Sequence, residues 1–205
     1  MRLIYLFLII FSQLSPAYAA ARSVSKADIQ VCFTPGQDCT AQITQALDHA
    51  KHSILVQAYS FTSEPIAKHL IAAKKRGVDI KVLLDKSQKS EKYSAARFLL
   101  NQKIPVWIDY KPAIAHNKVM IIDEKKIITG SFNFTKAAQY RNAENLLVIN
   151  DAELAKQYLE NWRHRRAVSE PANDAMLKNK ASSSHHKSAS QYSFSDIKKT
   201  ILAKF

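Results

Sequence analysis

The 205-residue sequence is poor in glycine, cysteine and acidic residues. Its three glycines exclude a glycine-rich nucleotide-binding loop. Its two cysteines lack the spacing of a CxxC redox pair, and the four convergent ligands of a zinc site are absent from the sequence pattern. Seventeen Asp and Glu stand against 30 Lys and Arg, which gives a formal net charge of +13. This excess predicts a polyanionic partner, either nucleic acid or an anionic membrane surface.

Residues 1–20 are typical of a cleaved signal peptide. Arg2 precedes an apolar run at residues 3–11, and Ala-Tyr-Ala at residues 17–19 forms a small-x-small cleavage signal. The run is short for a membrane-spanning helix, which disfavours the alternative of a retained anchor. We therefore expect an exported protein, periplasmic or secreted, with no integral membrane segment in the mature chain.

Cys32 and Cys39 flank a predicted turn at Pro35 and Gly36. An even number of cysteines in an exported chain favours a disulfide between them. Two unpaired thiols are the alternative.

Strand and helix patterns alternate along most of the chain. Apolar runs predict strands at residues 29–33, 53–60, 78–84, 104–108, 118–122, 126–129 and 145–149. Amphipathic stretches predict helices at residues 41–52, 65–76 and 91–102, with a last helix capped by Asp151 and ending near 166. This order predicts an α/β fold in which helices flank a mixed, largely parallel sheet.

The composition divides the chain into three parts. Residues 1–20 are the signal peptide, residues 21–166 the folded domain, and residues 167–205 a Ser- and Lys-rich tail that we expect to be flexible. No segment is repeated, so the folded domain carries one copy of its site.

The predicted hairpin at 118–129 gathers polar side chains at one end. His116 and Lys118 are two residues apart, so both project from the same face of a strand. If a tight turn closes the hairpin, paired residues have numbers that sum to about 248, which sets Lys118 opposite Gly130. Ser131 and Asn133 then lie beside His116. A side chain at Gly130 would crowd whatever lies between the strands.

Such a cluster suits attack on a phosphodiester. An imidazole forms a covalent intermediate with phosphorus, which splits one displacement into two. Lysine, amide and hydroxyl donors stabilise the charged phosphate oxygens without a metal or cofactor. A second acid/base group must protonate the leaving alcohol and later activate water.

These residues resemble a known motif, the HKD motif of the phospholipase D superfamily. The matching pattern is His116-x-Lys118-x4-Asp123-x6-Gly130-Ser131-x-Asn133. With a signal peptide, one short domain and one motif copy, the chain is most similar to the small exported bacterial non-specific endonucleases of that superfamily. The resemblance implies a phospholipase D-like α/β/α sandwich with phosphodiester hydrolase activity.

The resemblance also implies roles for the site residues. His116 is the expected nucleophile, which forms a phosphohistidine, and Lys118 and Asn133 bind the phosphate. Ser131 is expected to hydrogen-bond at the edge of the site. Family enzymes use two motifs per active site, and this chain has one. A homodimer with one His116 from each subunit is therefore expected, the second histidine acting as general acid and then base.

Two acidic residues complete the expected site. Asp123, at the hairpin turn, is expected to support the structure and its electrostatics rather than to act as a base. Glu144 is our candidate for orienting the imidazole of His116. The alternative for Glu144 is an ordinary surface or salt-bridging residue. Tyr59, Phe61 and Trp162 could stack on bases, but their pattern favours core packing.

Three functions fit these observations. The first is a metal-independent endonuclease of low sequence specificity that cleaves DNA, with RNA as a further substrate, because backbone recognition suits a basic surface. The second is a phospholipase or phosphatidyl transferase with the same chemistry. The third is a non-catalytic nucleic-acid-binding protein that uses the basic surface alone.

Overall fold

The computed structural model describes residues 28–177, so the predicted signal peptide and residues 178–205 of the predicted tail lie outside the described residues. The sheet contains eight described strands: β1 (Asp28–Thr34), β2 (Ser53–Ala58), β3 (Asp79–Asp85), β4 (Val106–Asp109), β5 (Lys118–Ile122), β6 (Lys126–Gly130), β7 (Glu144–Asn150) and β8 (Glu170–Pro171). The helical elements are α1 (Cys39–His49), α2 (Glu64–Lys75), the 3-10 turn η1 (Lys86–Lys89), α3 (Ala96–Asn101), α4 (Lys136–Tyr140) and α5 (Ala152–Ala167).

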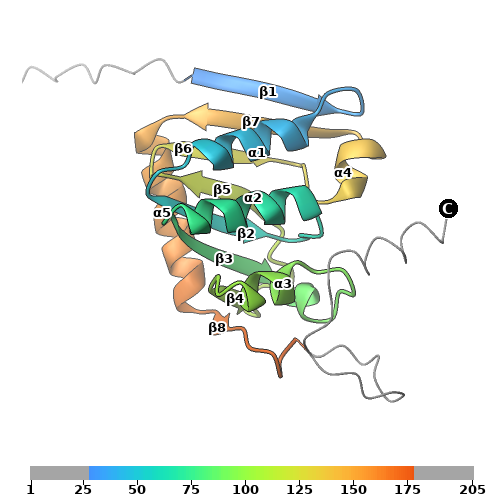
Figure 1. Ribbon diagram of the computed structural model, residues 1–205, viewed down its shortest axis with the longest axis vertical. Coiled ribbons are helices and arrows are strands. Elements are labelled where there is room, and N and C mark those ends of the chain that lie inside the picture. The colour runs from blue at the N-terminus through green and yellow to red at the C-terminus, as the bar shows by residue number, and fades with distance from the viewer. Residues whose placement is uncertain (1–27, 178–205) are drawn as a thin grey trace, which may run out of the picture.

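The sheet is mixed, as expected, but it is not largely parallel. Its strand order is β1-β7-β6-β5-β2-β3-β4-β8 (Figure 1). Strand β3 pairs in parallel with β2 and β4, whereas every other neighbouring pair of described strands is antiparallel. A parallel pair needs a long crossover, which α2 and α3 provide on either side of β3. The three-residue turn after β5 allows only an antiparallel neighbour, whereas β6 and β7 are antiparallel across a 13-residue connection that contains α4.

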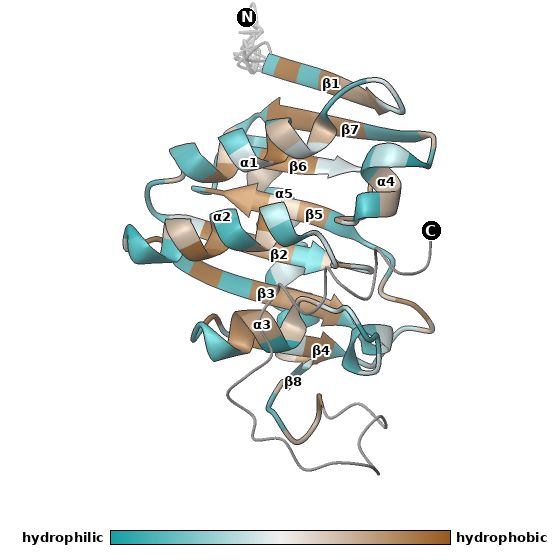
Figure 2. Ribbon diagram, turned by 45° about the vertical axis from the view of Figure 1, so that its right-hand side comes forward, coloured by the Kyte–Doolittle hydropathy of each residue, from teal (hydrophilic) through white to brown (hydrophobic). Residues whose placement is uncertain are grey.

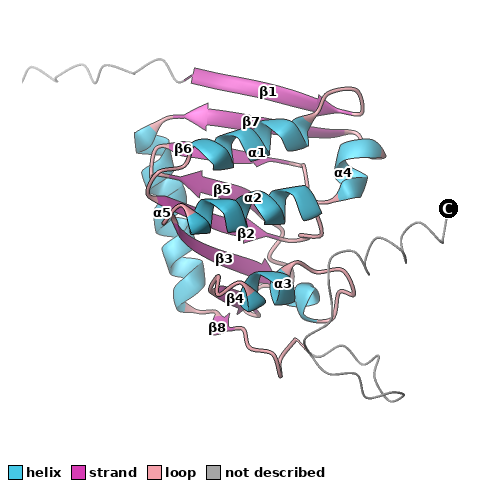
Figure 3. Cartoon of the chain, in the orientation of Figure 1, coloured by secondary structure: helices cyan, strands magenta, loops and turns pink. Residues whose placement is uncertain are grey.

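Helices cover both faces of the sheet (Figures 1 and 3). Helices α1, α2 and α3 pack on one face, where Ile43, Leu70 and Leu99 are fully buried. Helix α5 crosses the other face and buries Leu159 and Trp162 against β2, β3, β5 and β6. This arrangement confirms the α/β/α sandwich.

Local signals account for where the helices begin. The Asp38 side chain accepts from the N–H of Ala41 and begins α1, and the Asp151 carboxylate caps α5 as predicted. Helix α3 begins at Ala96 rather than at residue 91; its N-cap is Ala95, which makes no side-chain cap hydrogen bond, and the Ser94 hydroxyl just before it accepts from the backbone N–H of Ala96. Helix α4 and turn η1 had no clear sequence signal, since each spans little more than one turn.

The predicted domain boundary at residue 166 is wrong. Strand β8 pairs antiparallel with β4 and extends the sheet. Leu177 is buried in the core, and its carbonyl accepts a hydrogen bond from the Arg97 guanidinium. The fold therefore continues at least to residue 177, and the first part of the predicted flexible tail belongs to it.

The expected disulfide between Cys32 and Cys39 is present. Both half-cystines are fully buried, and the bond joins β1 to the first residue of α1. It fixes the edge strand to the helix that covers it.

Candidate active site

The hairpin of β5 and β6 has the predicted register. Met120 pairs with Ile128, and Ile122 pairs with Lys126, so paired numbers sum to 248. An open cavity of about 370 Å³ lies at the end of the hairpin away from the turn. Its lining consists of His116, Lys118, Gly130, Ser131, Asn133 and Glu144. Five of the six predicted site residues therefore lie together, and the sixth, Asp123, does not.

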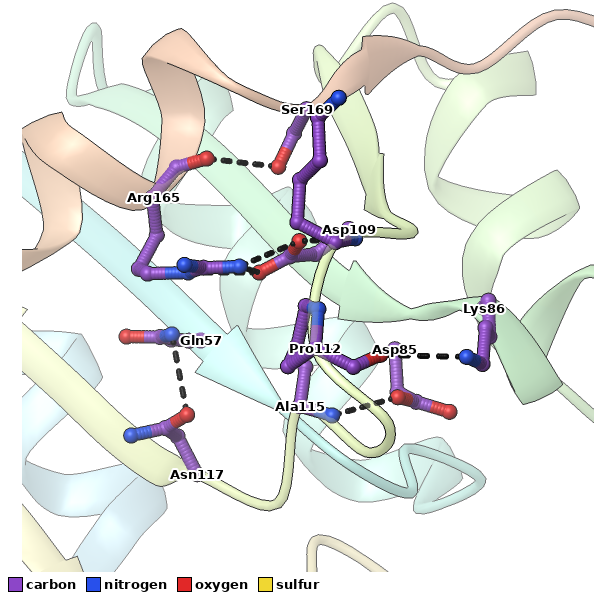
Figure 4. A network of polar contacts seen from close by, with 10 residues as sticks. Gln57, Asp85, Lys86, Asp109, Pro112, Ala115, Asn117, Arg165 and Ser169 are labelled. Atoms are coloured by element: carbon purple, nitrogen blue, oxygen red, sulfur yellow. Dashed lines mark hydrogen bonds and ion pairs between the residues drawn. The ribbon is translucent and has the colours of Figure 1, made fainter.

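The segment that leads to His116 is held by hydrogen bonds from the neighbouring strands (Figure 4). The Asp85 carboxylate, at the end of β3, accepts from the backbone N–H of Ala115 at 2.7 Å. The Gln57 amide donates to the Asn117 side chain at 3.1 Å, and Lys86 Nζ donates to the Pro112 carbonyl. These bonds anchor the backbone on both sides of the histidine.

Lys118 is a buried cation beside an exposed histidine. Lys118 is 5% exposed, and its Nζ donates to the His116 carbonyl oxygen at 2.7 Å. Burial lowers the pKa of Lys118 from its ordinary value, and the negative charge of Glu144 partly offsets this by raising the pKa. The His116 side chain is exposed at the cavity. The imidazole of His116 and the ammonium of Lys118 therefore line the same opening.

Within this chain, the Glu144 carboxylate hydrogen-bonds residues other than His116. Its carboxylate accepts from the Ser131 hydroxyl at 2.6 Å and from the Asn142 amide at 2.9 Å. Ser131 in turn accepts from the Asn145 N–H at 3.0 Å. Glu144 starts β7, which neighbours β6 rather than β5. Its carboxylate therefore lies within hydrogen-bonding distance of Ser131, the residue that follows β6. Glu144 thus contacts the site at Ser131, and its charge raises the pKa of Lys118.

Asn133 lines the cavity with an incompletely matched amide. Its Oδ1 is buried and has no hydrogen-bond partner among the described residues. An unpaired buried amide is normally matched by a bound ligand or water. The same amide offers N–H donors suited to phosphate oxygens.

Gly130 is required by a backbone contact. Its φ is +143°, and a Cβ there would lie 2.3 Å from the carbonyl oxygen of Asn145 on β7. That carbonyl accepts from the N–H groups of Ser131 and Phe132. The crowding predicted at this position therefore comes from the neighbouring strand β7, and the close approach fixes the start of the segment that carries Ser131 and Asn133.

Asp123 lies at the far end of β5. Its carboxylate accepts from the backbone N–H groups of Lys51, His52 and Ser53 at 2.7–2.9 Å. Burial alone would raise the pKa of Asp123, but these hydrogen bonds and the nearby His52 lower it below its ordinary value. Asp123 therefore ties the hairpin turn to the start of β2 and does not contribute to the cavity.

The core packing favoured for Tyr59 is wrong, because the residue is only half-buried and its ring lies against His116. It directly follows β2, and its ring centroid lies 4.6 Å from that of His116. Its backbone N–H donates to the Asn117 carbonyl at 2.8 Å. The strand run ending near residue 60 was visible in the sequence, but its pairing with β5 was not. Phe61 and Trp162 are core residues, as their pattern favoured.

Two further observations on residues 28–177 concern metal ions and membranes. That part of the chain holds no group of three His, Cys, Asp or Glu side chains placed to bind a metal ion. None of its helices combines the length and apolar character that spanning a membrane requires.

Comparison with known proteins identifies the family. A family model described as "Cardiolipin synthase, PLD-like domain" matches residues 43–166, which include the whole cavity. The chain belongs to the phospholipase D superfamily. Members of this superfamily act on phosphodiesters, and the chain is a phosphodiester hydrolase. This agrees with an enzyme rather than a non-catalytic binding protein.

Relatives within the phospholipase D superfamily carry different names. "Phospholipase D" of Rickettsia bellii is 51% identical over 144 residues, 70% of this chain and 72% of that protein. Human "Mitochondrial cardiolipin hydrolase" is 30% identical over 132 residues, 64% of this chain and 52% of that protein. The crystal structure of Nuc from Salmonella typhimurium, a phospholipase D family member, has a TM-score of 0.69 at 40% identity and covers 73% of this chain and 100% of its own. NucT from Helicobacter pylori shares the fold at 23% identity, with a TM-score of 0.65, over 72% of this chain and 100% of its own.

Proposed function

We propose that this phosphodiester hydrolase is an endonuclease of low sequence specificity that cleaves DNA, and also RNA, without a metal ion. The cavity that brings His116, Lys118 and Asn133 together carries the proposal. A net charge of +13 and the 40% identity to Nuc favour a polyanionic, nucleic-acid substrate. An open, exposed cavity suits a long polymer that passes across it.

The reaction proceeds in two displacements. The His116 imidazole attacks phosphorus, the N–P bond forms, and the P–O bond to the leaving alcohol breaks. The partner's His116 gives its proton to the leaving oxygen. Water then attacks phosphorus, the partner's His116 takes the water proton, and the N–P bond breaks. Lys118 and Asn133 donate to the phosphate oxygens in both transition states.

The exposed edge of the sheet supports a homodimer. Three apolar side chains on one face of β1, those of Ile29, Val31 and Phe33, are 47–56% exposed. None of them belongs to the buried cluster that packs around α5. The alternation along β1 is visible in Figure 2. Phe33 pairs with Asn145, the residue whose carbonyl binds Ser131, so this uncharged stripe runs up to the cavity. A second copy docked there covers the stripe and supplies the second histidine.

The dimer is tested by Phe33→Asp, with Gln30→Glu on the opposite face of β1 as the matched control. We expect light scattering to give a dimer for the wild type and Gln30→Glu, and a folded, inactive monomer for Phe33→Asp. A fully active wild-type monomer at the assay concentration would contradict the shared site.

A phospholipase is the second candidate, favoured by the names of the Rickettsia and human relatives. Purified protein is therefore incubated with plasmid DNA, RNA and phosphatidylcholine or cardiolipin vesicles in excess EDTA, with His116→Ala as the blank. We expect cleavage of DNA and RNA that persists in EDTA and disappears in the variant. Loss of cleavage in EDTA refutes the metal-free mechanism, and turnover of lipid alone favours the phospholipase.

We also propose that the protein is exported. The disulfide between buried Cys32 and Cys39 suits an oxidising compartment. Expression of the full chain followed by fractionation tests this: we expect a mature protein that begins after Ala19 or Ala21, outside the cytoplasm. Recovery of the uncleaved chain from the cytoplasm contradicts it.

A further inference from the structure

We infer that Asp85 and Asp109 are positioning residues of the active site. These two buried carboxylates, named here the carboxylate clamp, lie at the ends of β3 and β4 and hold the segment that leads to His116, which aims its imidazole. The inference rests on the proposed role of His116 as nucleophile. It assigns a function to side chains outside the motif and outside the lining of the cavity.

The segment of residues 110–117 follows a long path along one edge of the sheet. It connects β4 to β5, and the strand order β5-β2-β3-β4 places two strands between them. The segment therefore crosses three strand spacings, about 14 Å. It contains no helix or strand of its own, so the position of His116 depends on contacts made along this path.

The carboxyl ends of the parallel strands β4, β3 and β2 supply these contacts in the order in which the segment passes them (Figure 4). At β4, the Asp109 carboxylate accepts from the Lys111 N–H at 3.1 Å. At β3, the Asp85 carboxylate accepts from the Ala115 N–H at 2.7 Å. At β2, Asn117 hydrogen-bonds a side chain of the strand and the backbone just after it. Each strand thus fixes one point of the segment.

Asp85 uses both of its carboxylate oxygens. Its Oδ1 accepts from the Ser87 N–H at 2.8 Å, and its Oδ2 accepts from the Ala115 N–H. An asparagine has one acceptor oxygen and one NH2 group, so it can accept from only one of these two N–H groups when each faces a different side-chain atom. Ala115 directly precedes His116. The carboxylate therefore ties the residue before the nucleophile to the end of β3.

Asp109 is itself held by a cation from α5. Its carboxylate accepts from Nε and Nη2 of Arg165 at 2.7–2.9 Å. A buried ion pair of this kind adds little net stability, because both charges lose their hydration. The planar guanidinium nevertheless fixes the direction of the carboxylate that it binds. Arg165 thus orients the acceptor that receives the Lys111 N–H at the start of the segment.

The carboxylate clamp is complete within one chain. Asp85 is 2% exposed and Asp109 is 0% exposed. A second copy that docks at the cavity adds groups around the imidazole of His116, but it does not reach these carboxylates. The clamp acts on the backbone of the segment, so its role is compatible with any group of the partner that hydrogen-bonds the imidazole.

Loss of the clamp is expected to affect the chemical step more than substrate binding. Misplacement of a reacting atom by about 1 Å can cost about 100-fold in rate. The phosphate-binding residues have separate backbone support, because Lys118 lies in β5 and Asn133 follows β6. A shift of the segment therefore moves His116 relative to a phosphate that remains bound.

The experiment compares Asp85→Asn with Asp79→Asn. Asp79 is the first residue of the same strand β3 and has an exposed side chain, so the control makes the same chemical change at the other end. Hydrolysis of bis(p-nitrophenyl) phosphate and of plasmid DNA is measured, with His116→Ala as the blank and thermal melting as the control for folding. We expect Asp85→Asn to lose about 10- to 100-fold in kcat with KM within about 3-fold, and Asp79→Asn to stay within about 2-fold in both.

A second measurement follows the segment without relying on activity. By NMR, the Ala115 amide is expected to be protected from hydrogen exchange in the wild type and in Asp79→Asn, and to exchange at least about 10-fold faster in Asp85→Asn. Asp109→Asn loosens the same segment at its other end and replaces Asp85→Asn where that variant does not fold. We expect it to lose about 3- to 30-fold in kcat.

The outcomes separate the inference from the proposed function. A folded Asp85→Asn enzyme with wild-type kcat on DNA overturns the inference and leaves the endonuclease supported. A loss of kcat with the Ala115 amide still protected also overturns it, as does an equal loss in Asp79→Asn, which would assign the effect to overall charge. A rise in KM alone would assign Asp85 to substrate binding and overturn the positioning role. Cleavage of the small diester with none of DNA refutes the endonuclease and leaves the role of the carboxylate clamp supported.

Discussion

The two ends of β5 carry parts of one motif but differ in how their polar groups are matched. At the turn, the Asp123 carboxylate accepts three backbone N–H groups and is fully engaged. At the other end, about 16 Å away for a five-residue strand, His116 is exposed and Asn133 Oδ1 is unpaired. Saturated hydrogen bonding indicates a residue that holds the fold, whereas unmatched groups around a cavity are open to a ligand or to water. A motif that reads as one unit in the sequence thus divides into a reactive end and a structural end.

The largest difference between the two ends is expected from paired lysine substitutions. Lys118→Met removes a buried donor from the reactive end, and we expect kcat to fall about 100- to 1,000-fold, as for loss of a preorganised transition-state donor. Lys125→Met, in the turn at the other end, should leave kcat within about 2-fold, because surface charges away from the site act only weakly. Steady-state kinetics on a small diester measures both. Equal losses of kcat in the two variants would show that Lys118 acts only through its contribution to the overall positive charge of the protein.

A backbone change is expected to have the next largest effect. Gly130→Ala places a methyl group 2.3 Å from the Asn145 carbonyl and forces an unfavourable φ, so we expect a loss of about 2–4 kcal/mol in the free energy of unfolding together with reduced activity.

Gly77→Ala is the matched control for this change. Its φ is +93° but nothing lies within 4 Å of the added methyl, so it should cost only the backbone strain, about 1–2 kcal/mol, with normal kcat. Chemical denaturation measures both variants. Equal losses in the free energy of unfolding for the two variants would mean that the close approach of β7 to residue 130 does not affect stability.

The features that the sequence predicted correctly are those set over short distances along the chain. The register of the hairpin follows from a tight turn, and it alone placed Ser131 and Asn133 beside His116. The contacts of Glu144 and Tyr59 depend on strand order, since β7 lies beside β6 and β2 lies beside β5. Strand order is decided by packing between distant segments, and no local pattern encodes it. The same limit explains the overestimate of parallel pairing and the missed edge strand β8.

Glu144 offers a smaller test of the reactive end through the pKa of Lys118. Burial lowers this pKa and the charge of Glu144 raises it, so Glu144→Gln removes the raising effect and the pKa falls further. Activity that needs protonated Lys118 is then lost at a lower pH, and the alkaline limb of kcat/KM should move towards neutral pH. Glu124→Gln, a carboxylate at the turn, is the control and should leave the limb in place. A limb that moves to higher pH in Glu144→Gln would contradict the assignment.

The smallest effect on activity is expected at the structural end. Asp123→Asn tolerates the φ of +52° and keeps one acceptor oxygen for the N–H groups of His52 and Ser53, but its NH2 group cannot accept from the Lys51 N–H, so the substitution removes the charge and one hydrogen bond. The folded-state pKa of Asp123 is lowered, so its charge stabilises the fold above the unfolded pKa, about 3.9, and this contribution is lost as the pH falls through the folded value. We therefore expect Asp123→Asn to lose about 1–2 kcal/mol at pH 7 and progressively less below pH about 4, with kcat within about 2-fold of the wild type throughout. Urea denaturation at several pH values measures the loss of stability, and kinetics at pH 7 measures kcat. A fall in kcat comparable with that of Lys118→Met, at unchanged stability, would return Asp123 to the reactive group and remove the distinction between the two ends of β5.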